Sequence, residues 1–155
     1  MSRLDDVHAI EQLLYRYAVA IDTRDLAALD AVFTPDAWLD MSVAGTLTPA
    51  EYRAKAATVL ADLDATHHLL ASPLVEVADD GTTATAHCYY QAQHVRNDCP
   101  GGPLLLIGGW IDDELVRTPE GWRITRRRGR AVWFDGNPAV LGLDVRVPGG
   151  RRPVD

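Results

Sequence analysis

The stretch TTATAHCYYQAQHVR, residues 82–96, decides the fold because its residues alternate in character over the length of one long strand. Successive side chains of a strand point to opposite faces of the sheet. The even-numbered residues form one small and mostly apolar face: Ala84, Ala86, Cys88, Tyr90, Ala92 and His94. The odd-numbered face is polar: Thr85, His87, Tyr89, Gln91 and Gln93. The first face is typical of a cavity wall, with His94 as its polar exception.

Further strands surround this one. Residues 66–78 predict a strand that Pro73 makes either bulged or an edge strand. The Asp79–Gly81 turn joins it to the long strand. Strands are also predicted at 37–41, 104–117 and 122–134. The strands from residue 66 onward indicate an antiparallel meander in the second half of the chain.

Helices occupy the first half. Apolar residues recur at three- and four-residue steps over residues 3–21, with Ser2 and Asp5 as a capping box. A short helix is predicted at 25–33. A third begins after Thr48, with Pro49 at the first position and Glu51 completing a capping box, and runs to about residue 63.

Helices followed by a meander indicate the α+β class. Long antiparallel strands twist and curl, so three helices can close the open side. We therefore predict a conical barrel: three N-terminal helices packed on a strongly curved, mainly antiparallel sheet that encloses a pocket. Residues 1–135 form this domain. Residues 136–155 are a C-terminal tail. Its first part, 136–141, is a candidate pocket cap, and we expect the last residues of the tail to be mobile.

Composition excludes several functions. The 155 residues are 47% hydrophobic and 24% charged, with a net charge of −7. Such a charge argues against nucleic-acid binding. The two cysteines fit no zinc spacing, and no phosphate-binding loop or nucleophile elbow is present. Without a signal-peptide core or a membrane span of ~20 residues, we expect a cytoplasmic protein with no membrane partner. The single lysine, Lys55, is expected on an exposed helix face.

Four residues are candidates for catalysis: Tyr17, Asp22, His94 and one of the two adjacent histidines, His67 and His68. Asp22 directly follows the first helix, at the end where the helix dipole disfavours a carboxylate, although its spacing to Asp25 also fits a cap of the second helix. Only one of His67 and His68 can face the interior. Tyr17 lies on the buried stripe shortly before Asp22 and is the best phenol donor.

Other residues are assigned to the pocket wall or to the surface. The predicted substrate pocket is lined by Trp38, Met41, Tyr52, Ala86, Cys88, Tyr90, Leu106, Trp110 and Trp133. The run Arg126, Arg127, Arg128 and Arg130 is interpreted as a solvated face, and Asp112 and Asp113 as surface charges.

Three segments carry a resemblance to a known family: AIDTRDLAALDAVFTPDAWLD at 20–40, THHLLASPLVEVADDGTTATAHCYYQAQH at 66–94 and GWRITRRRGRAVW at 121–133. In this order they resemble a SnoaL-like domain of the nuclear transport factor 2-like superfamily. The resemblance implies a conical α+β barrel with a deep pocket. That superfamily includes dehydratases, isomerases, aldol-type cyclases, epoxide hydrolases and non-catalytic subunits.

The site resembles that of scytalone dehydratase, with an Asp-x-x-Asp stretch at Asp22–Asp25 and a Thr-x-His at 66–68. This resemblance implies His68 rather than His67, a second histidine at His94, and, from bile-acid dehydratase relatives, Tyr17. The tyrosine pair that holds a water in scytalone dehydratase is replaced by Ile21 and Met41. Its third-strand Ser and Asn fall near Gly109 and Ile111, so activation of the leaving oxygen must differ.

We therefore expect a cofactor-free lyase or isomerase, dehydratase-like, that acts on a small hydrophobic cyclic carbonyl compound of polyketide or terpenoid type. His68 is the expected general base and Asp22 its partner. Alternatives are an aldol-type polyketide cyclase, an epoxide hydrolase using Arg96-Asn97-Asp98, a site with two histidines and a carboxylate on a metal, and a non-catalytic binding or structural subunit. No metal is assigned. The resemblance also implies a homodimer through the polar sheet face.

Overall fold

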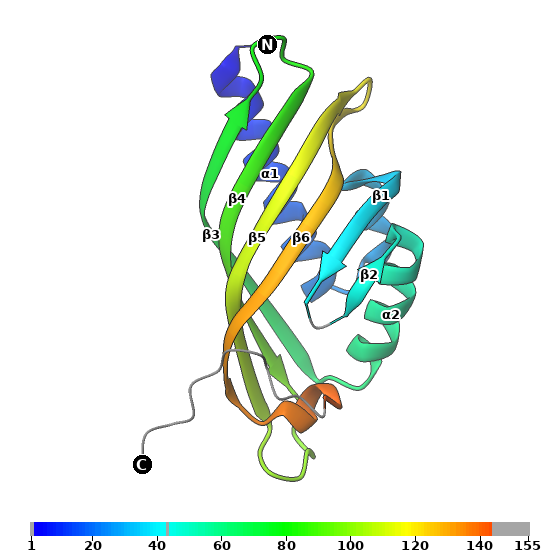
Figure 1. Ribbon diagram of the computed structural model, residues 1–155. Coiled ribbons are helices and arrows are strands. Elements are labelled where there is room, and N and C mark those ends of the chain that lie inside the picture. Colours follow the sequence, from blue (N-terminus) through cyan, green and yellow to red (C-terminus); the bar gives the residue numbers. More distant parts are fainter. Residues whose placement is uncertain (1, 43, 144–155) are drawn as a thin grey trace.

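The computed structural model describes residues 2–42 and 44–143. Two α-helices, two 3-10 helices and six strands make up these residues (Figure 1). The helical elements are α1 (Arg3–Asp22), η1 (Leu26–Ala31), α2 (Pro49–Ala61) and η2 (Pro138–Leu141). The strands are β1 (Phe33–Met41), β2 (Gly45–Leu47), β3 (Ala65–Val77), β4 (Thr83–Val95), β5 (Leu104–Thr118) and β6 (Gly121–Gly136).

The strands form one curved sheet in the order β2-β1-β6-β5-β4-β3. All neighbouring pairs are antiparallel except β1 and β6, which are parallel. Figure 1 shows α1 running behind the long strands and α2 beside β1 and β2, so the helices cover one face of the sheet. The predicted α+β class and the cone of helices on a curved, mainly antiparallel sheet are confirmed.

The helix starts follow from local capping. At α1, the Ser2 side chain accepts a hydrogen bond from the Asp5 N–H, and the Asp5 carboxylate accepts one from the Ser2 N–H. Thr48 and Glu51 make the same reciprocal pair at the start of α2. Each box satisfies two N–H groups that a helix start leaves without a partner inside the helix.

Two elements differ from the sequence prediction, and a third, β3, agrees with it. The second helix is a 3-10 helix, and its N-cap Asp25 makes no side-chain capping bond. The short strand β2 was not predicted, because three residues carry too little alternation. β3 is both an edge strand and irregular, since its register with β4 shifts between Ala71 and Leu74, around Pro73.

The core lies between the concave face of the sheet and the helices. Its fully buried members include Ile10 and Leu14 of α1, Leu39 of β1 and Ile124 of β6. Among the described residues, no helix has the length and apolar character needed to cross a membrane.

Candidate active site

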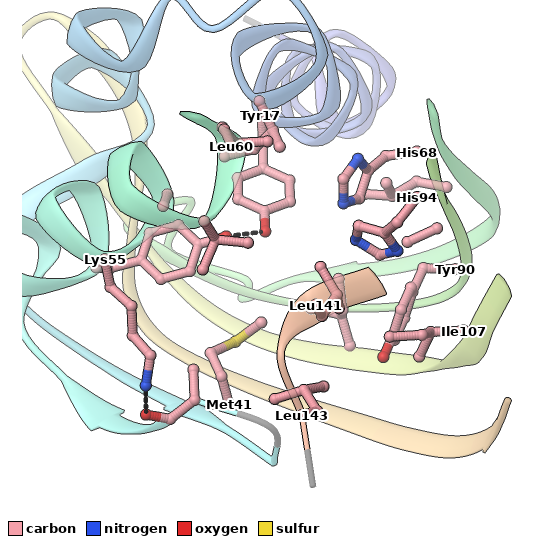
Figure 2. Close-up of a pocket in the computed structure, with 18 residues that line it drawn as sticks. Tyr17, Met41, Lys55, Leu60, His68, Tyr90, His94, Ile107, Leu141 and Leu143 are labelled. Carbon is pink, nitrogen blue, oxygen red and sulfur yellow. Dashed lines mark hydrogen bonds between the residues drawn. The ribbon is translucent and has the colours of Figure 1, made fainter. Parts of the chain in front are cut away.

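A cavity of about 180 Å³ lies between α1, α2 and the inner face of the sheet (Figure 2). Most of its wall is apolar, which suits an organic molecule with little polar surface. Six side chains bring polar atoms to this wall: Tyr17, Tyr52, Lys55, His68, Tyr90 and His94. The remaining lining residues are Ile21, Met41, Ala44, Ala56, Val59, Leu60, Leu70, Ala92, Ile107, Ile111, Leu141 and Leu143.

His68 is held in this wall by Asp22. Asp22 Oδ1 lies 2.6 Å from His68 Nδ1, and Asp22 Oδ2 accepts the His68 backbone N–H at 2.7 Å. Thr66 Oγ1 also donates to Asp22 Oδ1, at 2.9 Å. The two side chains are largely buried, with 14% of His68 and 20% of Asp22 exposed. Asp22 therefore joins the end of α1 to the start of β3 and makes no cap on η1.

The electrostatics of the pair favour a charged carboxylate. Burial alone raises the pKa of Asp22, but hydrogen bonds from the His68 ring, the His68 backbone and Thr66, with the attraction of His68, outweigh it. The pKa of Asp22 consequently lies below its ordinary value. An ionised Asp22 accepts the Nδ1–H of a neutral imidazole, which leaves Nε2 as the basic nitrogen.

His94 faces His68 across the cavity wall, with ring centroids 5.8 Å apart and ring planes at 84°. It is only 9% exposed, and its Nδ1 is buried with no hydrogen-bond partner. Burial, with a smaller contribution from the neighbouring His68, lowers the pKa of His94 to about 4. His94 is thus neutral near pH 7 and offers an unused hydrogen-bonding nitrogen beside the cavity.

Two phenols meet on another part of the wall. The hydroxyls of Tyr17, on α1, and Tyr52, on α2, are 2.6 Å apart, and their rings are stacked. Burial raises the pKa of Tyr52 well above its ordinary value, so this phenol stays protonated. Whichever hydroxyl donates within the pair, the other keeps its hydrogen for a ligand.

A buried ion pair between Arg127 and Asp113 packs against the Tyr17 ring. The Arg127 guanidinium lies 4.1 Å from the centre of the Tyr17 ring. It donates from Nε and Nη2 to the two carboxylate oxygens of Asp113, at 2.8 and 2.7 Å. Arg127 is 0% exposed and Asp113 is 3% exposed. The prediction that both are surface charges is therefore wrong. Both side chains lie on the inward face of the sheet. Successive side chains of a strand alternate between the two faces, so each run of charged residues in β5 and β6 directs one of its side chains inward.

The predicted wall residues divide into three groups: those that line the cavity, those that are packed in the core, and those that lie on the outer face of the sheet. Met41, Tyr52 and Tyr90 line the cavity as expected. Ala86 and Cys88 lie on the inward face of β4, but they are packed in the core and do not reach the cavity. The cavity takes its β4 residues from the later part of the strand, at Tyr90, Ala92 and His94.

Leu106 and Trp110 were assigned to the wrong face of β5. Leu105, Ile107 and Ile111 are the buried, inward residues, so Leu106 and Trp110 point outward. Residues 104–107 are all apolar, and alternation therefore could not show which of them face the core.

Trp38 and Trp133 are also outside the cavity. Trp38 lies under the Arg126 guanidinium at 4.6 Å, on the face of β1 opposite the fully buried Leu39. Trp133 pairs with Gly108 after a register shift that inserts an extra residue into β6 and reverses the alternation. Its ring occupies the space that a side chain at Gly108 would need, since an added Cβ would lie 2.1 Å from it.

Two alternative sites gain no support from the geometry. Arg96, Asn97 and Asp98 follow β4 and do not line the cavity. Within residues 2–42 and 44–143, no three His, Cys, Asp or Glu side chains are grouped so that they could hold a metal ion.

Of the α2 residues that line the cavity, sequence reasoning identified only Tyr52. Five of its residues line the cavity: Tyr52, Lys55, Ala56, Val59 and Leu60. Their spacing of three and four residues places them on one helix face, and this signal was available. Leu141 and Leu143, at and after η2, also line the cavity, whereas residues 144–155 of the predicted tail lie outside the described residues.

Known proteins resemble this chain over most of its length. The family model for the SnoaL-like domain matches residues 2–128. The uncharacterized protein Rv2910c of Mycobacterium tuberculosis is 34% identical over 82% of this chain and 86% of its own length. The terrestric acid biosynthesis cluster protein E of Penicillium crustosum is 32% identical over 90% of this chain and 91% of its own.

The fold is shared with enzymes of known structure. The crystal structure of a hexachlorocyclohexane dehydrochlorinase, LinA type 2, superposes with a TM-score of 0.77 at 20% sequence identity. The match covers 95% of this chain and 97% of that one. At this identity the likeness shows the common fold.

Proposed function

The chain belongs to the SnoaL-like domain family, and we propose that it is a lyase or isomerase of secondary metabolism that uses His68 as a general base without a cofactor. The observation that carries this proposal is the 2.6 Å contact between Asp22 and His68 in the wall of an apolar cavity. The dehydrochlorinase of similar fold catalyses an elimination, and the Penicillium relative belongs to a biosynthesis cluster, in keeping with such a role.

In the proposed reaction, His68 Nε2 removes a proton from the carbon next to a carbonyl group. An imidazole suits this step because its ordinary pKa lies near the working pH. Asp22 keeps Nδ1 protonated and stabilises the imidazolium that forms. The electron pair of the broken C–H bond moves onto the carbonyl oxygen as an enolate. The enolate then collapses to the carbon–carbon double bond and expels hydroxide from the β-carbon. The hydroxide takes the proton from the His68 imidazolium and departs as water, which regenerates the base.

Two groups are placed to assist. The Tyr17–Tyr52 pair can donate a hydrogen bond to the enolate oxygen, and neutral His94 can donate to the departing hydroxyl. The apolar wall limits access of water and strengthens these hydrogen bonds. The proposed substrate class is a small, hydrophobic, cyclic β-hydroxyketone of polyketide or terpenoid type.

The test is formation of a conjugated enone from a panel of cyclic β-hydroxyketones, followed by ultraviolet absorbance. The wild type should produce the enone, and His68→Ala should lose this activity while remaining folded. His67→Ala is the matched control, because His67 is the exposed neighbour on the opposite face of β3. Full activity in the His68 variant would falsify the proposal.

Product analysis separates the remaining alternatives. Reaction in ¹⁸O-labelled water should leave an enone without label, whereas hydrolysis of an epoxide would introduce one labelled oxygen. An aldol-type cyclisation would form a ring without loss of water. A ligand recovered unchanged after prolonged incubation would indicate a binding or structural protein.

A homodimer is a second part of the proposal. Leu69, Tyr89, Trp110 and Trp133 are large apolar side chains exposed on the outer face of the sheet. Tyr89 and Trp110 are directly paired across β4 and β5. Such a patch is typical of a protein interface. Light scattering should give about twice the chain mass of 17.0 kDa, and Trp110→Glu should reduce the mass to one chain. A single-chain mass for the wild type would contradict the dimer.

A further inference from the structure

Lys55 is a charged residue of the cavity that the proposed reaction leaves unused. It lies on the α2 face that contributes Tyr52, Ala56, Val59 and Leu60 to the cavity wall. No arginine, aspartate or glutamate of the described chain lines this cavity, so the charge of Lys55 is not balanced by another charged lining residue. A lysine in an otherwise apolar helix stripe calls for an explanation in terms of what the cavity binds.

The position of Lys55 gives the cavity two different ends. Figure 2 shows Lys55 on the opposite side from His68 and His94, with Tyr17 between them. One end thus carries the basic imidazole, and the other carries a cation. A ligand that spans the cavity would meet both.

The ammonium group retains hydrogen-bonding capacity. Lys55 Nζ donates one hydrogen bond, to the carbonyl oxygen of Ala44 at 2.9 Å. A lysine has three N–H donors, so two are available to a ligand. Because Ala44 also lines the cavity, its carbonyl group holds the Lys55 ammonium at the cavity wall. Lys55 is solvent-exposed, so its ammonium group also stays hydrated.

We infer that Lys55 is a specificity residue that binds a carboxylate on the substrate, at the end opposite the carbon from which His68 removes a proton. The substrate class becomes a hydrophobic cyclic ketone that also carries a carboxylate. Anchoring that group fixes the ring along the cavity and presents the carbon next to the carbonyl to His68. This inference rests on the proposed function only in that it takes the cavity as the substrate pocket.

The test compares two ligands that differ only in charge, 2-naphthoate and 2-naphthamide, by isothermal titration calorimetry at pH 7.5. Wild type should bind the carboxylate about two- to fivefold more tightly than the amide, as for an ion pair at an exposed site. Lys55→Gln should bind both ligands equally, with little change for the amide. Arg53→Gln is the matched control, because it removes the same charge from α2 at a partly buried residue that pairs with Asp30 and does not line the cavity.

Several results would overturn the inference. These are an equal affinity of wild type for the two ligands, no saturable binding of naphthoate, a preference that survives in Lys55→Gln, or an equal loss in Arg53→Gln. His68→Ala should keep the preference for the carboxylate. Binding therefore tests Lys55 separately from turnover, and the His68 proposal can fail while the Lys55 inference holds.

Discussion

The Asp22 carboxylate holds His68 at two points, because its Oδ1 contacts the ring Nδ1 at 2.6 Å and its Oδ2 accepts the backbone N–H at 2.7 Å. One residue thus sets both the path of β3 and the rotation of the imidazole. The same carboxylate that fixes the strand also fixes which ring nitrogen carries the proton.

The first prediction concerns this pair. Asp22→Asn should leave the protein folded but lower kcat by about 10²–10⁴-fold, because an amide no longer selects the Nδ1–H tautomer or stabilises an imidazolium. Steady-state kinetics measure the loss, and ¹⁵N NMR of the imidazole reports the tautomer. Asp25→Asn is the control, since Asp25 is exposed and its side chain caps nothing. An Asp22 variant with wild-type kcat would remove the dyad from the mechanism.

The second prediction concerns the phenol pair. Tyr17→Phe should lower kcat by about 10²-fold with a small change in KM, as expected for a donor that acts mainly on the transition state. Tyr52→Phe should have a smaller effect, because Tyr52 supports Tyr17 through the 2.6 Å hydroxyl contact. Tyr15→Phe, an exposed tyrosine on the same helix, should change nothing. Equal activity of Tyr17→Phe and Tyr15→Phe would assign the enolate contact elsewhere.

The third prediction concerns the pH dependence of stability. His94 has a pKa of about 4 in the folded protein and about 6.5 when unfolded. The unfolded chain therefore binds the extra proton first, and the free energy of unfolding should fall as the pH decreases from 6.5 to 4, by up to about 3 kcal/mol. This loss should be absent in His94→Gln.

Urea unfolding at pH 7.5 and pH 4.5 measures this difference, with His67→Gln as the control on the exposed face of β3. Asp22, with its lowered pKa, also loses stabilising contacts in acid, but in both proteins and mainly below its ordinary value of 3.8. The same acid sensitivity in wild type and His94→Gln would show that His94 is not buried in its neutral form.

The sequence was most informative where local chemistry determines structure. The capping pairs at Ser2 and Thr48 predict the starts of both α-helices, and alternation in 82–96 predicts the inward face that ends at His94. The resemblance to dehydratases, through the spacing of Tyr17 before Asp22 and of Thr66 before His68, points to four residues that the fold brings together around the cavity and its edge.

The errors arise where the face of a strand depends on distant contacts. Leu104–Ile107 offers no polar residue to show which side is outside, so Leu106 and Trp110 were placed inward. The register shift before Trp133 reverses the alternation of β6, and it depends on pairing with β5. Arg127 is buried because Asp113 of the neighbouring strand neutralises it, and sequence spacing does not show that contact.

The fourth prediction concerns this buried pair. Burial alone would lower the pKa of Arg127, but Asp113 outweighs that effect and keeps the guanidinium charged. Arg127→Met should reduce the free energy of unfolding by about 3–5 kcal/mol, because it leaves Asp113 buried without its partner. Replacing both residues, Arg127→Met with Asp113→Leu, should cost less than the single change. Urea unfolding measures both variants, and a double variant less stable than the single one would contradict this account.

The role of His68 as the general base can be measured by hydrogen–deuterium exchange at the carbon next to the carbonyl of a cyclic ketone that lacks the hydroxyl leaving group. Proton removal is then the only chemistry observed, and NMR in D₂O follows it. The wild type and His67→Ala should catalyse the exchange, and His68→Ala should exchange only at the buffer rate. Exchange by His68→Ala at the wild-type rate would contradict the assignment of His68 as the base.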